Sequence, residues 1–448
     1  MYTRTVSIKN PSNKFYFVLA VLYKLALDIS YKNIISKEYA YMSFLNNRTT
    51  EYAVLSWILL CIMLLLCKKH YDNHENRLSD EIVFWLFLIA YIPFTTLVGF
   101  GVFSPLFILC NCIYWIILLA PVRIRGVNRD SRVSLLDKKV INDNHIRVIT
   151  IVSFLVVLYV SGRYTGFRIN LQLLNVYEFR NEARNYNLPV LLDYVFTWTR
   201  TVNAILEAYY IRRKRYGWAA ACFLIQVLNY GVDGAKTTMF LAILVIIINI
   251  LPSFEIKKLN RWALLGFVGI TFICYLAYIW FDEILPEAII TRRVFFVPAY
   301  LQSNYFDFFA SHTPDFFRQG FLRFLGFESP YPNIAYMIGD LYSHQSNMSA
   351  NNGLISDAMT NLGYAGIVLM PILIRLVLRI LDRASEGLDN RLYLAVALYV
   401  SIVLSNSFLF TTLLTHGLLV VILLLGTMNR DLSSLQPRRI VIRSFWGT

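Results

Sequence analysis

Apolar runs of the length that crosses a lipid bilayer recur along almost the whole chain. They reach about 16 to 22 residues, and a hydrocarbon core about 30 Å thick needs about 20 residues of helix. Only 16% of the 448 residues are charged and 57% are hydrophobic, which is too little polar surface for a soluble protein of this size. The sequence therefore predicts an all-α polytopic membrane protein, with residues 1–448 forming one transmembrane domain. We expect about 12 spans, starting near residues 15, 52, 82, 102, 148, 190, 216, 236, 262, 354, 392 and 412.

The distribution of basic residues predicts the orientation of these spans. Of the 42 Lys and Arg residues, about 27 fall on the side of the N-terminus and about 12 on the other side, and cytoplasmic loops carry the excess in membrane proteins. Both termini are therefore expected in the cytoplasm. This bias also accounts for the net charge of +14, so nucleic-acid binding is not expected. The orientation places two loops outside, one at residues 163–189 and a large one at residues 281–353, between spans nine and ten.

Span six carries a stripe of polar residues that a bilayer disfavours. Asp193, Arg200 and Glu207 recur every seven residues, which places them on one helix face. A charge at mid-helix costs about 2.5 to 3.5 kcal/mol on insertion scales. Span seven has a matching stripe that ends at Asp233, with Lys236 just beyond it. The two stripes predict either a hydrated or ligand-filled cleft open to the outside, or mutual pairing, for example of Arg200 with a nearby acid.

Other polar motifs have structural explanations. Lys24 and Asp28 are four residues apart in span one and are expected to pair. The stretch GVDGAKT at 231–237 resembles a phosphate loop, but an alanine replaces the required glycine and the spacing is one residue short. No metal site is predicted, because the ligand-type residues between His70 and Glu75 lie in a hydrophilic turn and are expected to be solvated.

Arginines gather in the two external loops, where the charge bias of membrane proteins disfavours them. The planar guanidinium holds phosphate oxygens through two hydrogen bonds and keeps its charge when desolvated, so an anionic partner is expected. Contacts with lipid headgroups or with nearby acids are the alternative. Adjacent Arg292 and Arg293 do not share a helix face, so at most one is expected to face a given ligand. The arginines are Arg163, Arg168, Arg180 and Arg184 in the first loop, and Arg292, Arg293, Arg318 and Arg323 in the second.

The second external loop is also rich in aromatic residues between Phe295 and Phe317. This composition predicts interfacial helices that rest on the bilayer surface rather than a free loop. The rings, among them Tyr300 and Tyr305, are expected either to stack on sugars or to anchor the protein in the membrane.

Six short motifs lie between the first external loop and span ten. They are YEFR at 177–180, GAKT at 234–237, RRVFFVP at 292–298, YFDFF at 305–309, NNGLISD at 351–357 and NLGYAG at 361–366. Together they resemble the O-antigen polymerases of the Wzy type, most strongly from Tyr177 to Pro371. The first four spans diverge too far to add to the resemblance.

The resemblance implies a glycosyltransferase of the bacterial inner membrane with a GT-C-like helical fold. Similar proteins take a glycan from undecaprenyl pyrophosphate and transfer it to the terminal sugar of another lipid-linked repeat unit on the periplasmic side. The implied partners are the lipid-linked donor and acceptor, the bilayer and a chain-length regulator. Neither a cofactor nor a metal is expected, because a sugar diphosphate is already activated.

This reaction needs positive charge at one place in particular. When the acceptor hydroxyl attacks the anomeric carbon with inversion, the departing diphosphate must be stabilised. Arg292 or Arg293 is expected to supply that charge. Further contacts with the anion are expected from Arg168, Arg180, Arg184, Arg200 and Lys236.

The acceptor hydroxyl is expected to have a base beside it, a histidine or a carboxylate. His344 is the first candidate, ahead of Asp357, His312 and Glu328. Asn351 and Asn352 are expected either to bind sugar hydroxyls or to cap the next span, and Asp357 to extend the polar site.

Three other functions remain compatible with the sequence. An O-antigen ligase would deliver the glycan to lipid A core. A lipid-linked oligosaccharide flippase or transporter would have about as many spans but no need of an external catalytic insert. A eukaryotic channel or transporter would carry glycans at the sequons Asn47-Arg48-Thr49 and Asn347-Met348-Ser349.

Overall fold

The chain is helical throughout the part that the computed structural model describes, which confirms the expected all-α class. That part comprises residues 14–72, 77–120, 144–168, 182–183, 185–250, 256–343, 348–428 and 430. A helix lies at each of the expected span positions. Within these described ranges, five helical segments are long and apolar enough to cross a membrane, and four shorter apolar helices accompany them. The structure is therefore consistent with a polytopic membrane protein. The number of membrane crossings stays a prediction.

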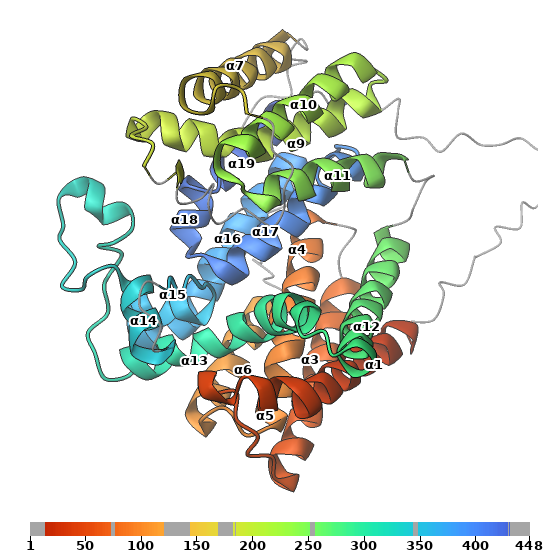
Figure 1. Ribbon diagram of the computed structural model, residues 1–448, viewed down its shortest axis with the longest axis vertical. Coiled ribbons are helices and arrows are strands. Elements are labelled where there is room, and N and C mark those ends of the chain that lie inside the picture. Colours follow the sequence, from red (N-terminus) through yellow and green to blue (C-terminus); the bar gives the residue numbers. More distant parts are fainter. Residues whose placement is uncertain are drawn as a thin grey trace, which may run out of the picture.

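Figure 1 shows two groups of helices on either side of a central layer. The first group contains α1 (Lys14–Ser30), α3 (Thr50–Asp72), α5 (Ile92–Gly99), α6 (Pro105–Leu119) and α12 (Ile256–Phe281). The second contains α7 (Asn144–Val160), α9 (Val190–Arg212), α10 (Tyr216–Asp233) and α11 (Lys236–Ile250). The central layer contains α4 (Leu78–Leu86), α16 (Gly366–Ser385), α17 (Leu394–Asn406), α18 (Leu409–Leu414) and α19 (Leu418–Thr427).

Short and wide helical turns complete the described chain. Four segments are π-helical: η1 (Tyr31–Ile35), η3 (Phe87–Tyr91), η4 (Ser161–Thr165) and η5 (Glu287–Phe296). The large insert continues with α13 (Val297–Phe309), η6 (Phe321–Leu325) and α14 (Ile334–Ser343), and α15 (Ile355–Leu362) follows it. The remaining short elements are α2 (Ser36–Glu38), η2 (Ala40–Met42), η7 (Gly363–Ala365) and η8 (Asn390–Leu392).

Polar contacts tie together the loops at one end of the bundle. Arg212 forms an ion pair with Asp389 at 2.5 Å. Ser79 donates to Asp382 through both its backbone nitrogen and its hydroxyl, at 2.8 and 2.6 Å. Three of the loops that were expected on one side of the membrane therefore share one end. Which side that end faces stays a prediction.

One buried charge inside the first group is paired. Lys24 is fully buried, and its Nζ donates to Asp28 at 2.8 Å. The pair predicted from their spacing is therefore confirmed. The ammonium also lies 4.8 Å from the centre of the Trp57 ring, and this cation–π contact lowers the cost of keeping the charge away from water.

The large insert is helical, and its aromatic residues lie among other helices. Phe295, Phe296, Tyr305 and Phe306 are at most 2% exposed, because η5 packs against α5 and α12 while α13 packs against α5 and α15. Figure 1 shows α13 crossing between the first group and α14 with α15. The rings thus fill the interior of the protein. The position of the insert relative to a bilayer surface stays a prediction.

The entry into α15 is set by a close backbone contact. Gly353 donates its N–H to the carbonyl oxygen of Ser405 at 3.1 Å. A Cβ on Gly353 would lie 2.1 Å from the carbonyl oxygen of Leu404, so no larger residue fits there without movement. This contact fixes α15 against the end of α17 and thereby places the chain that leads to α18.

Candidate functional site

The polar stripes of α9 and α10 face each other and pair. This is the second of the two alternatives that the stripes predicted. The pairs between the stripes are Asn229 Nδ2 with Thr199 Oγ1 at 2.8 Å, Gln226 Nε2 with Glu207 Oε2 at 3.2 Å, and the ion pair of Arg200 with Asp233. Such pairing is what permits two polar helix faces to meet inside an apolar bundle.

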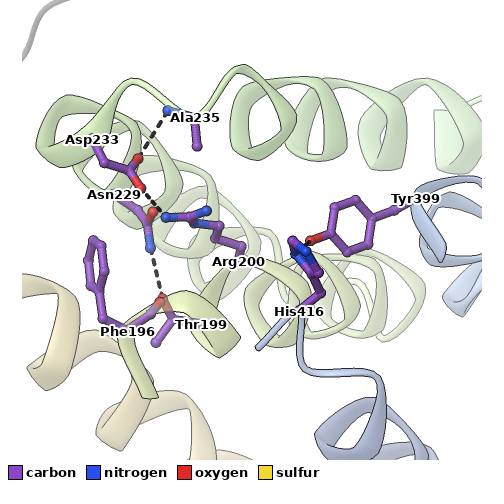
Figure 2. Close-up of polar contacts among 8 residues, drawn as sticks. All are labelled: Phe196, Thr199, Arg200, Asn229, Asp233, Ala235, Tyr399 and His416. Carbon is purple, nitrogen blue, oxygen red and sulfur yellow. Dashed lines mark hydrogen bonds and ion pairs between the residues drawn. The ribbon is translucent and has the colours of Figure 1, made fainter. Parts of the chain in front are cut away.

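Arg200 lies at the centre of the polar contacts drawn in Figure 2. Its Nη2 donates to Asp233 Oδ2, and Asp233 Oδ1 accepts the N–H of Ala235 at 3.0 Å. The Arg200 side chain is 14% exposed and that of Asp233 is 24% exposed. Buried Nε of Arg200 has no hydrogen-bond partner among the residues that the structure describes. The guanidinium therefore keeps an unused donor while its charge is balanced by a single acid.

His416 lies on the other side of Arg200, in the turn between α18 and α19 (Figure 2). One ring nitrogen is 3.1 Å from the Ser407 hydroxyl and the other is 3.4 Å from the Tyr399 hydroxyl. The indole of Trp198 on α9 donates to the carbonyl oxygen of Leu414, which holds this turn against α9. His416 was not among the candidates named from the sequence, although an ionisable residue inside an apolar span is itself a signal of a functional site.

Two more basic residues lie near this end of α10. The carbonyl oxygen of Arg168 lies 2.3 Å from the position of a Cβ on Gly231, so the loop after η4 touches α10 directly. The Arg168 side chain forms an ion pair with Glu182 at 2.9 Å, and this hydrogen bond holds the pKa of the Glu182 carboxyl below its ordinary value. Lys236 is exposed at the first residue of α11.

Helix α18 connects this cluster to the insert. The ring of Phe410 in α18 packs against two rings of the insert. Its centroid lies 5.2 Å from that of Phe317 and 4.7 Å from that of Phe321. The first residue of α18, Leu409, donates its N–H to Asp357 of α15 at 2.6 Å. The insert and the Arg200 cluster are therefore separated by one short helix that touches both.

The structure gives Arg292 and Arg293 different surroundings from Arg200. Arg292 Nη1 is 3.4 Å from the sulfur of Met42, and its guanidinium lies 4.3 Å from the centre of the Tyr39 ring. Arg293 is exposed. Both belong to η5, which packs in the first helix group, whereas Arg200 belongs to the second. The expected convergence of these arginines on one cleft is not found among the described contacts.

Other predicted contact residues are engaged within the fold. Tyr305 donates its hydroxyl to the carbonyl oxygen of Ala350 at 3.0 Å, and Asn352 donates to that of Pro298 at 2.8 Å. Asp357 accepts bonds from Asn361 and Leu409. Each of these three is at most 2% exposed. Tyr300 is partly buried with its ring 5.1 Å from Phe44, and Asn351 is exposed.

Several candidates lie outside the described residues, namely His344, Arg180 and Arg184. Of the other suggested bases, His312 is exposed and stacked on Phe308 at 4.1 Å, and Glu328 is exposed. Neither approaches the Arg200 cluster through a described contact. Within the described ranges, no group of three or more His, Cys, Asp or Glu residues could hold a metal ion.

The Arg200 cluster combines groups with complementary chemistry. A partly buried guanidinium with an unused donor can hold an anion, and the one acceptor nitrogen of a neutral histidine can take a substrate hydroxyl in exchange for its present hydroxyl partner. Both lie at the end of the bundle that α18 joins to the insert. Comparisons of the chain with protein-family models, with curated proteins and with solved structures give no match.

Proposed function

We propose that the protein is a membrane glycosyltransferase that joins lipid-linked oligosaccharide repeat units outside the cytoplasmic membrane, and that it takes the growing glycan from undecaprenyl pyrophosphate. The observation that carries the proposal is the pairing of Arg200 with a single acid beside His416, at the junction of α9, α10 and α18. The six sequence motifs that resemble Wzy-type polymerases support it. An arginine, an acid and a histidine placed in this way suit a reaction that expels a diphosphate and deprotonates a hydroxyl.

In the proposed reaction, the acceptor hydroxyl oxygen forms a bond to the anomeric carbon while the bond from that carbon to the diphosphate oxygen breaks. The electron pair leaves with the diphosphate, and Arg200 stabilises the charge. The hydroxyl proton passes to a base. His416, whose ring already lies 3.1 Å from the Ser407 hydroxyl, takes the role that the sequence assigned to His344.

The proposal predicts a specific change in cell-surface glycan. Deleting the gene in its host is expected to convert a ladder of repeat lengths into core plus one repeat, as seen by gel electrophoresis. Complete loss of attached repeats would indicate a ligase or a flippase instead. The purified protein is expected to extend lipid-linked repeats in the presence of EDTA, and a requirement for added divalent metal would contradict the arginine mechanism.

A comparison of variants tests which arginines serve the leaving group. Because Arg292 contacts Tyr39 and Met42, we expect Arg292→Ala and Arg293→Ala to keep a full ladder with less than a tenfold loss of rate. Arg292 and Tyr39 are both partly buried, and a cation–π contact contributes about 0.5 to 1 kcal/mol at exposed sites and about 2 kcal/mol where it is desolvated. Ladders collapsed to one repeat in either variant, with Arg200→Gln still active, would place the leaving group at the insert.

A further inference from the structure

Arg200 is already neutralised by a residue of its own chain. Asp233 occupies Nη2 of the guanidinium, so an anion that binds Arg200 must share or replace this carboxylate. We propose that the diphosphate of the lipid-linked donor binds by exchange, displacing the Asp233 carboxylate from Arg200. This inference rests on the proposed function. In this proposal the Asp233 carboxylate competes with the diphosphate for Arg200. This competition sets the affinity of the site and its selectivity for anions of higher charge.

Charge favours exchange over simple addition. A diphosphate carries more negative charge than a carboxylate, and two anions within a few ångströms of each other repel strongly where little water screens them. The Arg200 and Asp233 side chains are 14% and 24% exposed, so screening is limited but the pair can be reached from solvent. The group with the larger charge therefore takes the guanidinium, and the carboxylate moves away.

The turn that follows Asp233 can accommodate this movement. Asp233 is the last residue of α10, and Gly234 after it has a left-handed backbone with φ of +63°. The other carboxylate oxygen accepts the N–H of Ala235 at 3.0 Å, so the acid keeps one partner when it leaves Arg200. Lys236, exposed two residues after Gly234, begins α11 and can approach the same anion.

Unsatisfied donors beside this turn support a ligand there. The Nε atom of Arg200 is buried and lacks a partner, and so does the hydroxyl of Thr238, which is fully buried in the first turn of α11. Both statements apply to the residues that the structure describes. Buried polar atoms without partners are uncommon in folded proteins, and a bound oxyanion would satisfy them.

Exchange has a consequence for selectivity and for product release. A lipid monophosphate has less charge than a lipid diphosphate with which to displace the carboxylate, so the site discriminates against it. After transfer, the released lipid diphosphate has lost its sugar and carries one more negative charge than the donor. The Asp233 carboxylate competes with it for Arg200, which weakens its retention.

Binding of farnesyl diphosphate to the full-length protein tests the exchange. Phosphatidylcholine nanodiscs are used so that no anionic lipid competes. We expect Asp233→Asn to bind farnesyl diphosphate at least fivefold more tightly than the wild type and to discriminate less against farnesyl monophosphate. Arg200→Gln is expected to bind at least tenfold more weakly. Asp389→Asn is the matched control, because Asp389 pairs with Arg212 at the other end of the bundle, and its affinity is expected to stay unchanged.

The exchange would be overturned by the affinity of one variant. An Asp233→Asn protein that binds farnesyl diphosphate no more tightly than the wild type overturns the exchange. If that variant does not fold, Asp233→Ser provides the same comparison, since its hydroxyl can still accept the N–H of Ala235. Ligand-induced shifts in melting temperature give a second measure of affinity, because stabilisation grows with ligand concentration relative to Kd.

The exchange and the proposed function can fail separately. A protein that forms glycan ladders but shows no gain in affinity in Asp233→Asn would retain the function and lose the exchange. A protein that makes no glycosidic bonds but shows the gain would keep the exchange as a property of a diphosphate-binding protein and lose the polymerase.

Discussion

Arg200→Gln is expected to abolish the glycan ladder and leave single-repeat products. Loss of one group that stabilises developing negative charge typically lowers the rate by about 10² to 10³, or about 2.7 to 4 kcal/mol. Arg200→Lys is expected to retain part of the rate, since an ammonium keeps the charge but loses the planar fork. The measurement is the rate of repeat addition by protein reconstituted with lipid-linked substrate.

A structural effect must be separated from a catalytic one, because Arg200→Gln leaves Asp233 without its cation. The double variant Arg200→Gln/Asp233→Asn removes both charges and is expected to recover the melting temperature but not the activity. Arg212→Gln, which breaks the ion pair at the other end of the bundle, is expected to polymerise normally. Ladders from the double variant at the wild-type rate would rule out Arg200 as the group that meets the leaving diphosphate.

Gly353→Ala is expected to cause a large loss of folded protein. The new methyl carbon would lie 2.1 Å from the carbonyl oxygen of Leu404 and 2.6 Å from that of Ser407, well inside van der Waals contact. Overpacking of an interior typically costs about 1 to 3 kcal/mol, and here backbone atoms would have to move. The expected result is a lower melting temperature and less monodisperse protein in detergent.

Gly266→Ala provides the matched control for this change. Gly266 lies inside α12, and a Cβ there meets no atom within 4 Å. This variant is expected to match or slightly exceed the wild type, because alanine favours helix by up to about 1 kcal/mol over glycine. A Gly353→Ala protein as stable as Gly266→Ala would show that α15 does not depend on its close approach to α17.

The sequence predicted the elements that depend on local pattern. Hydropathy alone placed the helices, because apolar side chains in a run of sufficient length have few other stable arrangements. The seven-residue spacing of Arg200 and Glu207 predicted the polar face of α9, and the stripe on α10 supplied its partner. Whether the faces would open into a cleft or pair was left undecided, since that depends on the distance between two helix axes.

The contacts that depend on distant segments were not predictable. His416 meets Tyr399 and Ser407 only because the chain breaks between α17 and α18 and again before α19. Asp357 accepts the N–H of Leu409, 52 residues away, and so caps a helix in place of extending a polar site. Arg292 lies over Tyr39 because η5 packs against the first group of helices. No local spacing encodes any of these three arrangements.

Helix α18 has only six residues and is fastened at both ends. Asp357 holds its start, and Trp198 of α9 holds the carbonyl oxygen of its last residue. Because α18 is short and is held at both ends, a displacement of one end is expected to move the other end as well. A rearrangement of the insert at Phe317 or Phe321, which contact Phe410 of α18, is therefore expected to shift the turn that carries His416.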